Sequence, residues 1–347
     1  MTHKVRDGRR RPATRHEHME EAVAGADEAI EPGTGIPTDL GGILGRSRTF
    51  AAGVRSVEPL VGGLTNTNYK VVTDHGSFVV RIGGRGSEHL AIDREHEYEN
   101  SLAAAESGIG APVVERLEDP SVLVVGYIEG RTLSARDLRD GPYMERIASA
   151  CRQLHQGRPF RGRFDMFALQ RRYLAVVRRK GFRLPSGYLE FSGAVEDARR
   201  AMAVRPEAPL PCNNDLLAEN FIDDGEKIWI IDYEYSGNNE PSFELGNVWS
   251  ESDLSLEQLE ALVGAYYGTT LRDKVARARL WGLMSKYGWT LWASIQAAVS
   301  DTDFDFWEWG MEKYERAVAE FGGPDFDRLL ADVALGEGDR RAGAWSR

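Results

Sequence analysis

Residues 209–237, PLPCNNDLLAENFIDDGEKIWIIDYEYSG, place two carboxylates and an amide at a spacing that decides how the rest of the chain is interpreted. Asp215 and Asn220 lie five residues apart in an expected loop, so both side chains can face one point without sharing a helix. The apolar run IWII predicts a short strand that delivers Asp232 at its end. A carboxylate and an amide oxygen that converge on one place suit Mg²⁺, which binds a few protein oxygens and leaves other positions to water and phosphate.

Taken one at a time, these residues have a simpler explanation, because aspartate and asparagine are favoured in the turns of any protein. Together, at this spacing, they are much less expected by chance. A carboxylate that can orient a hydroxyl group and accept its proton, beside a bound divalent cation, makes up the parts of a phosphoryl-transfer site. The stretch therefore predicts that Asp215 positions an acceptor hydroxyl and that Asn220 and Asp232 hold Mg²⁺.

The composition of the 347 residues excludes several classes of protein. A net charge of −11 argues against a mainly nucleic-acid-binding role, because neutralising nucleic-acid phosphates requires an excess of Lys and Arg. The two cysteines, Cys151 and Cys212, lie in apolar contexts without C-x-x-C spacing, which favours a reduced, cytoplasmic protein without a structural metal. No apolar run approaches the roughly 18 residues of a membrane span. The basic start leads into an acidic segment, which is not typical of a signal peptide.

The chain is expected to fold as an α+β protein of two lobes behind a charged tail. Blocky charge and few large apolar residues predict a disordered tail over residues 1–38. Residues 39–128 hold five β-branched runs and a helical stretch near 90–107, which predicts a small lobe with an antiparallel sheet. Gly76, in the turn TDHGS, can take the positive φ that a tight hairpin needs.

Helical periodicity dominates the larger second lobe, residues 129–347. Short strands are expected there only near 220–222 and 228–232, on either side of the turn that precedes Asp232. The join between the lobes falls near residues 127–133.

The first lobe also carries groups suited to a nucleotide. In VGGLTNTNY, Gly62 and Gly63 let the backbone approach a ligand, and Thr65 and Asn66 offer donors, as in a hairpin that covers phosphates. Such Gly-Gly turns are common, so the loop alone is weak support.

Arg81, near the end of the apolar run SFVVRI, is the cation best placed for nucleotide phosphates, although it can equally be a solvated charge at a strand end. Glu97, in the following helical stretch, is the expected partner that holds it, and spacing alone does not exclude Glu95 or Glu99.

The motifs GGLTN, VVRI, GYIEGRTL, LHQG, CNNDLLAENFI and IIDYEYSG occur in the order seen in the choline/ethanolamine kinase and aminoglycoside phosphotransferase superfamily, which this sequence resembles from about residue 40 to about residue 320. These small-molecule kinases have a two-lobed fold like that of protein kinases. The resemblance implies that Asp215 is the catalytic aspartate, that Asn220 and Asp232 bind Mg²⁺, and that Glu234 is an additional acid at the metal. It also implies that Arg81 replaces the lysine of protein kinases.

The same resemblance implies ATP as the phosphoryl donor, with Tyr127 and Ile128 beside the adenine, where their backbone can offer hydrogen bonds. His155, in the LHQG motif, is expected to be structural, at the end of a helix behind the catalytic loop. Asn213 departs from the family, which usually has histidine two residues before the catalytic aspartate. Because asparagine can also donate a hydrogen bond to the backbone, we expect activity to survive this replacement.

An acceptor site is expected between the catalytic loop and the carboxy-terminal helices. Trp289 and Trp292 lie three residues apart on one helical face, and Trp309 follows in the next aromatic cluster. Their rings can surround an ammonium group by cation–π contact, as in the aromatic cage of the family that the sequence resembles, although the same rings can equally be packing core. Glu240 and Glu244 offer carboxylates to a primary amine, and Glu244 is more simply the acid that steadies the metal loop.

The sequence thus predicts a kinase that transfers the γ-phosphate of ATP to a small amino alcohol, with choline or ethanolamine as the leading acceptors. Phosphorylation of another hydroxyl compound, such as an aminoglycoside or a sugar, is the first alternative. An inactive relative that binds ligand or a partner without turnover is the second. The natural acceptor, the choice between ATP and GTP and the oligomeric state stay open at this point.

Overall fold

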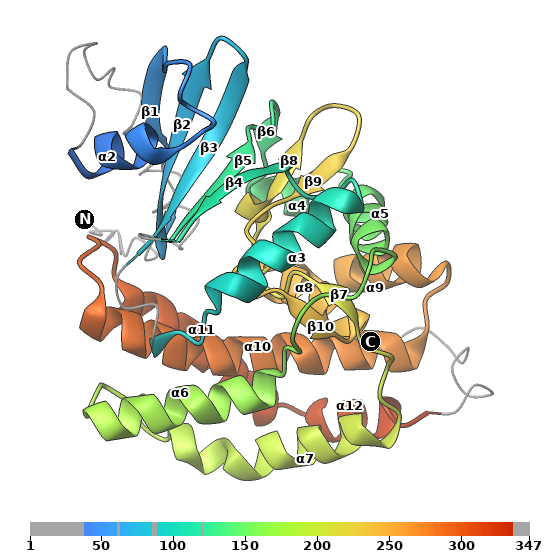
Figure 1. Ribbon diagram of the computed structural model, residues 1–347. Coiled ribbons are helices and arrows are strands. Elements are labelled where there is room, and N and C mark those ends of the chain that lie inside the picture. The colour runs from blue at the N-terminus through green and yellow to red at the C-terminus, as the bar shows by residue number, and fades with distance from the viewer. Residues whose placement is uncertain (1–37, 61–62, 85–88, 119–120, 336–347) are drawn as a thin grey trace, which may run out of the picture.

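The computed structural model describes residues 38–60, 63–84, 89–118 and 121–335 (Figure 1). It shows a β-sheet lobe followed by a larger lobe made mostly of helices, so the predicted two-lobed α+β architecture is confirmed. The predictions for the tail over residues 1–37 and for Gly62 lie outside the described residues.

The first lobe is built on a five-stranded sheet in the order β1-β2-β3-β5-β4, and each pair of neighbours is antiparallel. Its strands are β1 (Ser56–Leu60), β2 (Asn66–Thr73), β3 (Gly76–Gly83), β4 (Val113–Leu117) and β5 (Val122–Gly126). Gly76 takes φ 144° in the turn between β2 and β3, a conformation that glycine adopts without steric cost.

Two helices pack on this sheet. The valines of β2, β3 and β5 bury one face against α2 (Thr38–Arg46), whose leucines and isoleucine are shielded from solvent. Burial of these apolar groups is the main favourable term that holds α2 in place. The second helix, α3 (Arg94–Glu106), begins at Asp93, whose carboxylate accepts from the N–H groups of Glu95 and His96. It contacts β4, and its Glu97 is buried.

A buried carboxylate on β4 fastens the segment that follows α2. Glu115 accepts hydrogen bonds from the hydroxyls of Ser47 and Thr49 and from the backbone N–H groups of Arg48 and Thr49. Burial by itself would raise the pKa of Glu115, but these four donors outweigh it and lower the pKa to about 2. The charged form is therefore the one that the folded state favours.

Replacing Glu115 with glutamine is expected to destabilise the protein by roughly 2 to 3 kcal/mol at pH 7, because the charge-assisted bonds are lost. The pKa is lowered on folding, so this contribution is complete above the unfolded pKa of about 4.5 and is lost as the pH falls toward about 2. Denaturant unfolding of wild type and Glu115→Gln between pH 3 and pH 7 measures it. The exposed Glu118→Gln is the control, and a difference that does not shrink with falling pH would contradict the assignment.

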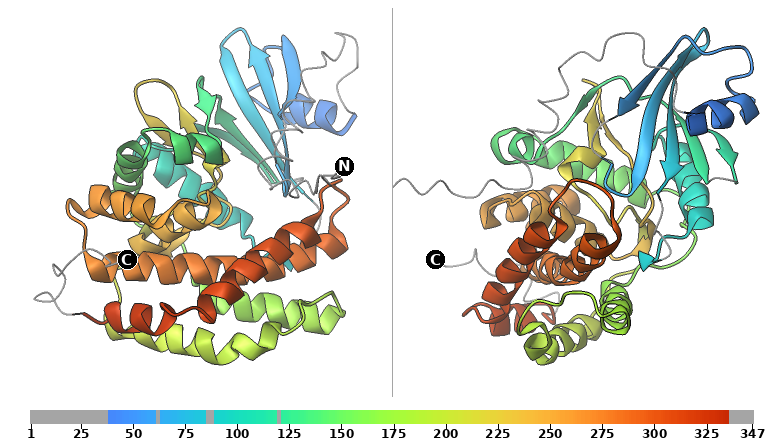
Figure 2. Two further views of the ribbon diagram at one scale, coloured as in Figure 1. Left: turned by 180° about the vertical axis from the view of Figure 1, so that it is seen from behind. Right: turned by 90° about the vertical axis from the view of Figure 1, so that its left-hand side faces the viewer.

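The second lobe is organised around one long helix. α10 (Arg272–Val299) spans the width of the lobe, is buried over most of its length, and packs on α6, α8 and α11 (Figures 1 and 2). The close approach to α8 requires glycine, since a Cβ on Gly246 would lie 2.0 Å from the carbonyl oxygen of Ala278. The remaining helices are α4 (Ala135–Asp140), α5 (Met144–His155), α6 (Met166–Lys180), η3 (Tyr188–Phe191), α7 (Ser192–Val204), α8 (Pro241–Glu251), α9 (Leu256–Tyr267), α11 (Phe306–Phe321) and α12 (Phe326–Asp332).

The prediction of only two short strands in this lobe is wrong. Besides β8 (Phe221–Asp223) and β9 (Ile228–Ile230), the described residues include β6 (Arg131–Thr132), β7 (Leu210–Cys212) and β10 (Gly237–Asn239). β6 pairs with β8, and β7 pairs with β10. Strands of two or three residues show no alternating pattern, and they exist only because a distant partner supplies their hydrogen bonds.

None of the helices among residues 38–335 that the structure describes, α10 included, is both long enough and apolar enough to pass through a bilayer.

Candidate active site

The loops after β7 and β9 each hold a polar residue in a strained backbone conformation. Asn214 takes φ 67° and Asp232 takes φ 63°, values that are uncommon outside glycine. The Asn214 amide donates to the carbonyl oxygens of Cys212, Tyr235 and Gly237, and its backbone N–H donates to Glu244 at 2.6 Å. These bonds fix the backbone immediately before Asp215.

Asn213, two residues before Asp215, connects two segments of the site. It is fully buried, and its amide nitrogen donates to the carbonyl oxygens of Ile231 and Asp232 at 3.1 and 2.7 Å. Its amide oxygen accepts from the N–H of Asp215 at 3.0 Å. One side chain therefore ties the segment of Asp215 to the segment of Asp232.

Asn213→Ala is expected to lower the free energy of unfolding by about 2 to 4 kcal/mol, because it leaves buried backbone groups without partners. We also expect kcat to fall, since Asp215 and Asp232 lose their common tether. Thermal melts and steady-state rates measure both effects. Glu226→Ala, exposed in the β8–β9 turn, is the control, and an unchanged melting temperature in Asn213→Ala would contradict the tether.

One pocket joins the predicted catalytic groups to the predicted acceptor site. The empty space in this pocket, its open mouth included, amounts to about 630 Å³ and lies between the lobes. Gly63, Leu64 and Thr65 contribute the side that belongs to the first lobe. Five acids line it, namely Asp215, Glu219, Asp232, Glu234 and Glu251. Asn220, Leu217 and four aromatic residues complete the lining described here, the aromatic residues being Tyr235, Trp289, Trp292 and Trp309.

Asn220 and Asp232 offer hard oxygen ligands at this pocket. The amide nitrogen of Asn220 donates to the carbonyl oxygen of Asp215 at 2.7 Å, so its amide oxygen is the atom available to a cation. Asp232 follows β9 and contacts Arg81 Nη2 through Oδ1 at 2.5 Å. A carboxylate and an amide oxygen, with space for water and phosphate, fit Mg²⁺ better than a softer metal.

Arg81 lies at the centre of a network of ion pairs. Its guanidinium contacts Glu97 at 3.2 Å and Glu234 at 3.2 Å, besides Asp232. Burial by itself would lower the pKa of Arg81, but the carboxylates of Asp232, Glu97 and Glu234 raise it above its ordinary value. Glu97 of α3 is thus the partner of Arg81. The two alternatives on the same helix pair elsewhere, Glu95 with Arg116 and Glu99 with Arg161.

Glu234 is buried and has both carboxylate oxygens engaged. Oε1 accepts from the Thr65 hydroxyl at 2.7 Å, and Oε2 accepts from the Asn66 amide at 2.9 Å. Arg81 and Arg94 also contact Oε2, at 3.2 and 3.4 Å. Burial and the neighbouring Asp232 carboxylate raise the pKa of Glu234, and the two arginines oppose that rise. Glu234, the acid expected at the metal, is therefore hydrogen-bonded to Thr65 and Asn66 of the first lobe in this structure.

The groups of the first lobe that are predicted to meet the nucleotide have partners within the protein in this structure. Thr65 and Asn66, expected as phosphate donors, donate to Glu234, because a buried carboxylate requires donors of its own. The Tyr127 N–H, expected beside adenine, donates to the Ser77 carbonyl at 3.0 Å and is used within the sheet. Ile128 follows it at the join between β5 and β6 and does not line the pocket.

Gly63 is where a side chain would not fit. A Cβ there would lie 2.4 Å from the carbonyl oxygen of Asn66, so glycine is required for this close turn.

The three tryptophans predicted for the acceptor site all line the pocket. Trp292 donates its Nε1 proton to the Tyr235 hydroxyl at 2.9 Å and meets Trp309 edge to face, with ring centroids 5.5 Å apart. Trp289 meets the Tyr235 ring in the same manner at 5.0 Å. One face of Trp309 is covered by Lys313, whose Nζ lies 4.4 Å from the ring centroid. Part of this cluster is therefore packing, as the simpler interpretation held.

Several residues at the site were not predicted. Glu219 and Glu251 line the pocket, and Glu251 pairs with Lys313 at 2.6 Å. Arg94 bridges Glu97 and Asn66. The sequence around these three residues has no feature that marks a site, so only the fold identifies them. Asn214 is different, because the Asn-Asn doublet before Asp215 was a usable signal for it.

The two acids considered for a primary amine have other partners. Glu240 accepts from Arg277 at 2.6 and 2.9 Å and from Trp281 Nε1 at 2.9 Å, and it does not line the pocket. Glu244 accepts from the Asn214 N–H, so it steadies the catalytic loop. Neither acid lines the pocket, so the prediction that either of them faces an amine there is wrong.

Comparison with known proteins supports the resemblance. The model of the choline/ethanolamine kinase family matches residues 57–262. The protein LicA of Haemophilus influenzae is 26% identical over 250 residues, which cover 68% of this chain and 72% of LicA. A choline/ethanolamine kinase family protein from Mesorhizobium loti superposes with a TM-score of 0.76 at 32% identity, covering 86% of this chain and 99% of that structure.

The fold is also shared with more distant phosphotransferases. The GDP complex of wild-type aminoglycoside 2'-phosphotransferase-IIIa superposes with a TM-score of 0.60 at 12% identity, covering 82% of this chain and 99% of that structure. At that identity the likeness is one of fold alone.

Proposed function

The chain belongs to the choline/ethanolamine kinase family, and we propose that it transfers the γ-phosphoryl group of ATP to the hydroxyl of a small amino alcohol, choline or ethanolamine. One observation carries the proposal. A single pocket combines Asp215, Asn220 and Asp232 with the rings of Trp289 and Trp292. A reacting hydroxyl and an ammonium group a few atoms away can therefore occupy it together.

In the proposed reaction the acceptor oxygen attacks the γ-phosphorus, the bond to the bridging oxygen of ADP breaks, and the hydroxyl proton passes to Asp215. Asp215 orients that hydroxyl, and the hydrogen bonds from the N–H groups of Asp215 and Asn214 hold the backbone that carries it. Arg81 contacts Asp232, which lines the pocket. From there its positive charge neutralises the charge of the phosphates. Because little covalent chemistry is asked of the protein, these positioning groups supply most of the rate.

Asn220 and Asp232 would hold Mg²⁺, which when bound neutralises charge on the ATP phosphates. The five acids of the lining make such a cation necessary, since the pocket would otherwise repel a polyphosphate. The same acids attract a cationic acceptor. Glu234, engaged by Thr65 and Asn66 here, can serve the metal only after those bonds are exchanged.

A screen of purified protein with Mg·ATP against choline, ethanolamine, related amino alcohols, hexoses and kanamycin tests the proposal. We expect phosphate transfer to one or both of the first two compounds and none to hexoses. The acidic lining favours an aminoglycoside as the second candidate, because polycationic acceptors need several carboxylates. Turnover of kanamycin alone would replace the first candidate by the second.

An inactive binding protein would give a different result. It would show a thermal shift with Mg·ATP and no transfer to any acceptor. That outcome would contradict both proposed activities and would leave the family assignment unchanged.

Trp289→Leu is expected to raise the KM for the amino alcohol about 2- to 30-fold, because a cation–π contact of roughly 0.5 to 2 kcal/mol is lost. Trp289→Phe should lie between wild type and the leucine variant, since it keeps a smaller ring. The KM for ATP should change little. Trp281→Leu, on the same helix but outside the pocket lining, is the matched control. Equal KM values for wild type, Phe and Leu variants would remove Trp289 from the acceptor site.

A further inference from the structure

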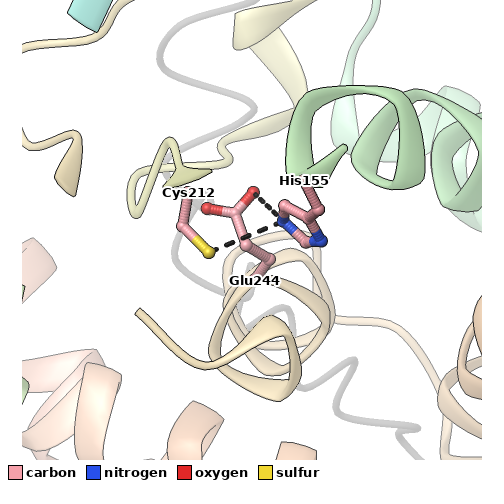
Figure 3. Close-up of side chains that lie close together, drawn as sticks. All are labelled: His155, Cys212 and Glu244. Carbon is pink, nitrogen blue, oxygen red and sulfur yellow. Dashed lines mark hydrogen bonds and ion pairs between the residues drawn. The ribbon is translucent and has the colours of Figure 1, made fainter. Parts of the chain in front are cut away.

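A second group of ligand-type side chains lies behind the catalytic loop, outside the pocket. His155 ends α5, Cys212 ends β7, and Glu244 lies in the first turn of α8 (Figure 3). All three are buried, and Glu244 is fully so. One ligand atom from each lies within 4.8 Å of the other two.

The distances suit one small metal ion. His155 Nε2 lies 3.5 Å from Cys212 Sγ and 3.9 Å from Glu244 Oε2. A tetrahedral zinc ion with ordinary bond lengths separates its S, N and O ligands by about 3.3 to 3.6 Å. The sulfur–nitrogen distance already matches, whereas the carboxylate oxygen lies about half an ångström too far from the nitrogen and within 4.8 Å of the other two ligand atoms, so the Glu244 side chain must move inward for the ion to bind.

An unpartnered atom points into this cluster. Within the described part of the chain, Glu244 Oε2 accepts no hydrogen bond, although it is completely shielded from solvent. Its other oxygen, Oε1, accepts from the Asn214 N–H at 2.6 Å. A buried carboxylate oxygen without a donor is costly, and a bound cation is one of the few groups that satisfies it.

The surroundings also orient the histidine. The Tyr266 hydroxyl lies 2.7 Å from His155 Nδ1. With the Nδ1 proton donated to the tyrosine oxygen, the lone pair of Nε2 faces Cys212 and Glu244. Such a partner on the far nitrogen is the usual support of a metal-binding histidine.

We propose that His155, Cys212 and Glu244 form a buried site for one Zn²⁺ ion behind the loop that carries Asp215. Zinc accepts sulfur, nitrogen and carboxylate ligands together, whereas Mg²⁺ strongly prefers oxygen, so the two metals have different sites in this chain. Binding displaces the proton of the Cys212 thiol. The thiolate and the carboxylate then balance the two positive charges of the ion.

The sequence predicted no structural metal, because the cysteines lack C-x-x-C spacing. The site instead takes its ligands from positions 155, 212 and 244, which only the fold brings together. Cys212 lies just before the catalytic loop in the sequence, and the Glu244 carboxylate accepts a hydrogen bond from the N–H of Asn214. Both ligands are therefore linked to the loop that carries Asp215. A bound ion would therefore hold the backbone before Asp215.

The test uses the full chain, purified under reducing conditions, stripped with a chelator and titrated with Zn²⁺ against a chromophoric competitor. We expect one tightly bound zinc per chain, a rise in melting temperature of about 5 °C at a hundredfold excess over Kd, and thiolate-to-metal absorption when Co²⁺ replaces zinc. Cys212→Ala should weaken binding at least 100-fold and abolish that absorption. Tyr266→Phe should weaken binding about 10- to 100-fold.

Two controls separate this site from others. Asp232→Asn alters the active-site pocket, and Cys151→Ala removes the other buried thiol, so both should bind zinc like wild type. Failure to bind zinc with a Kd below micromolar overturns the proposal. It is equally overturned if Cys212→Ala binds zinc as tightly as wild type, or if Asp232→Asn loses the ion.

Discussion

Asp215→Asn is expected to lower kcat about 10²- to 10⁴-fold, because the acceptor hydroxyl loses the group that orients it and takes its proton. The amide has almost the same shape as the carboxylate, and the backbone N–H of residue 215 still donates to Asn213. The fold and the affinity for Mg·ATP should therefore change little. Steady-state rates with saturating ATP and acceptor measure the loss.

The pattern of constants separates a catalytic loss from a structural one. If Asp215 acts on the acceptor, kcat falls while the thermal shift with Mg·ATP is retained and the melting temperature of the free protein stays within a few degrees of wild type. Glu226→Gln, exposed in a nearby turn, is the control for an added amide. A variant with kcat within threefold of wild type would eliminate Asp215 as the catalytic group.

Asp232→Asn is expected to cost still more, about a thousandfold or greater in kcat/KM for ATP, since metal-assisted charge neutralisation supplies several kcal/mol. Arg81 also loses its closest carboxylate, at 2.5 Å, but keeps Glu97 and Glu234, so it stays paired and the lobe should remain folded. The measurement is the thermal shift with Mg·ATP, together with the Mg²⁺ concentration needed for half-maximal rate.

The two variants differ in a way that identifies their roles. Asp232→Asn should lose the Mg·ATP thermal shift, whereas Asp215→Asn should keep it. Raising Mg²⁺ should partly rescue the first and not the second. If Asp232→Asn binds Mg·ATP like wild type, the metal is held elsewhere, and Glu234→Gln becomes the variant to compare, because that buried acid lies beside Asp232 in the same network.

Part of this site was predictable because its spacing is local. Asp215, Asn220 and Asp232 lie within 18 residues, and a loop, a turn and the strand β9 connect them. Short connections leave few ways to arrange such groups, so the pattern alone brought them to one pocket. The pairing of Arg81 with a glutamate of the following helix was also predictable, but only the fold selects Glu97 over Glu95 and Glu99.

The partners of the buried acids were not predictable. The Thr65 hydroxyl, predicted as a phosphate donor, donates in this structure to Glu234, which lies 169 residues away in the sequence. Glu240 meets Arg277, not an amine, and Cys212 meets His155 across 57 residues. Each pairing depends on how the lobes and helices dock.

The sequence by itself therefore determined the two-lobed architecture, the order of the main strands and helices, and the acids and amide of the catalytic segment, because these follow from local periodicity and short connections. The tertiary structure decided which donor each buried carboxylate obtained, where the two- and three-residue strands formed, and which tryptophan faces stayed open. A buried polar group must find a partner wherever the fold supplies one, and a linear pattern does not contain that geometry.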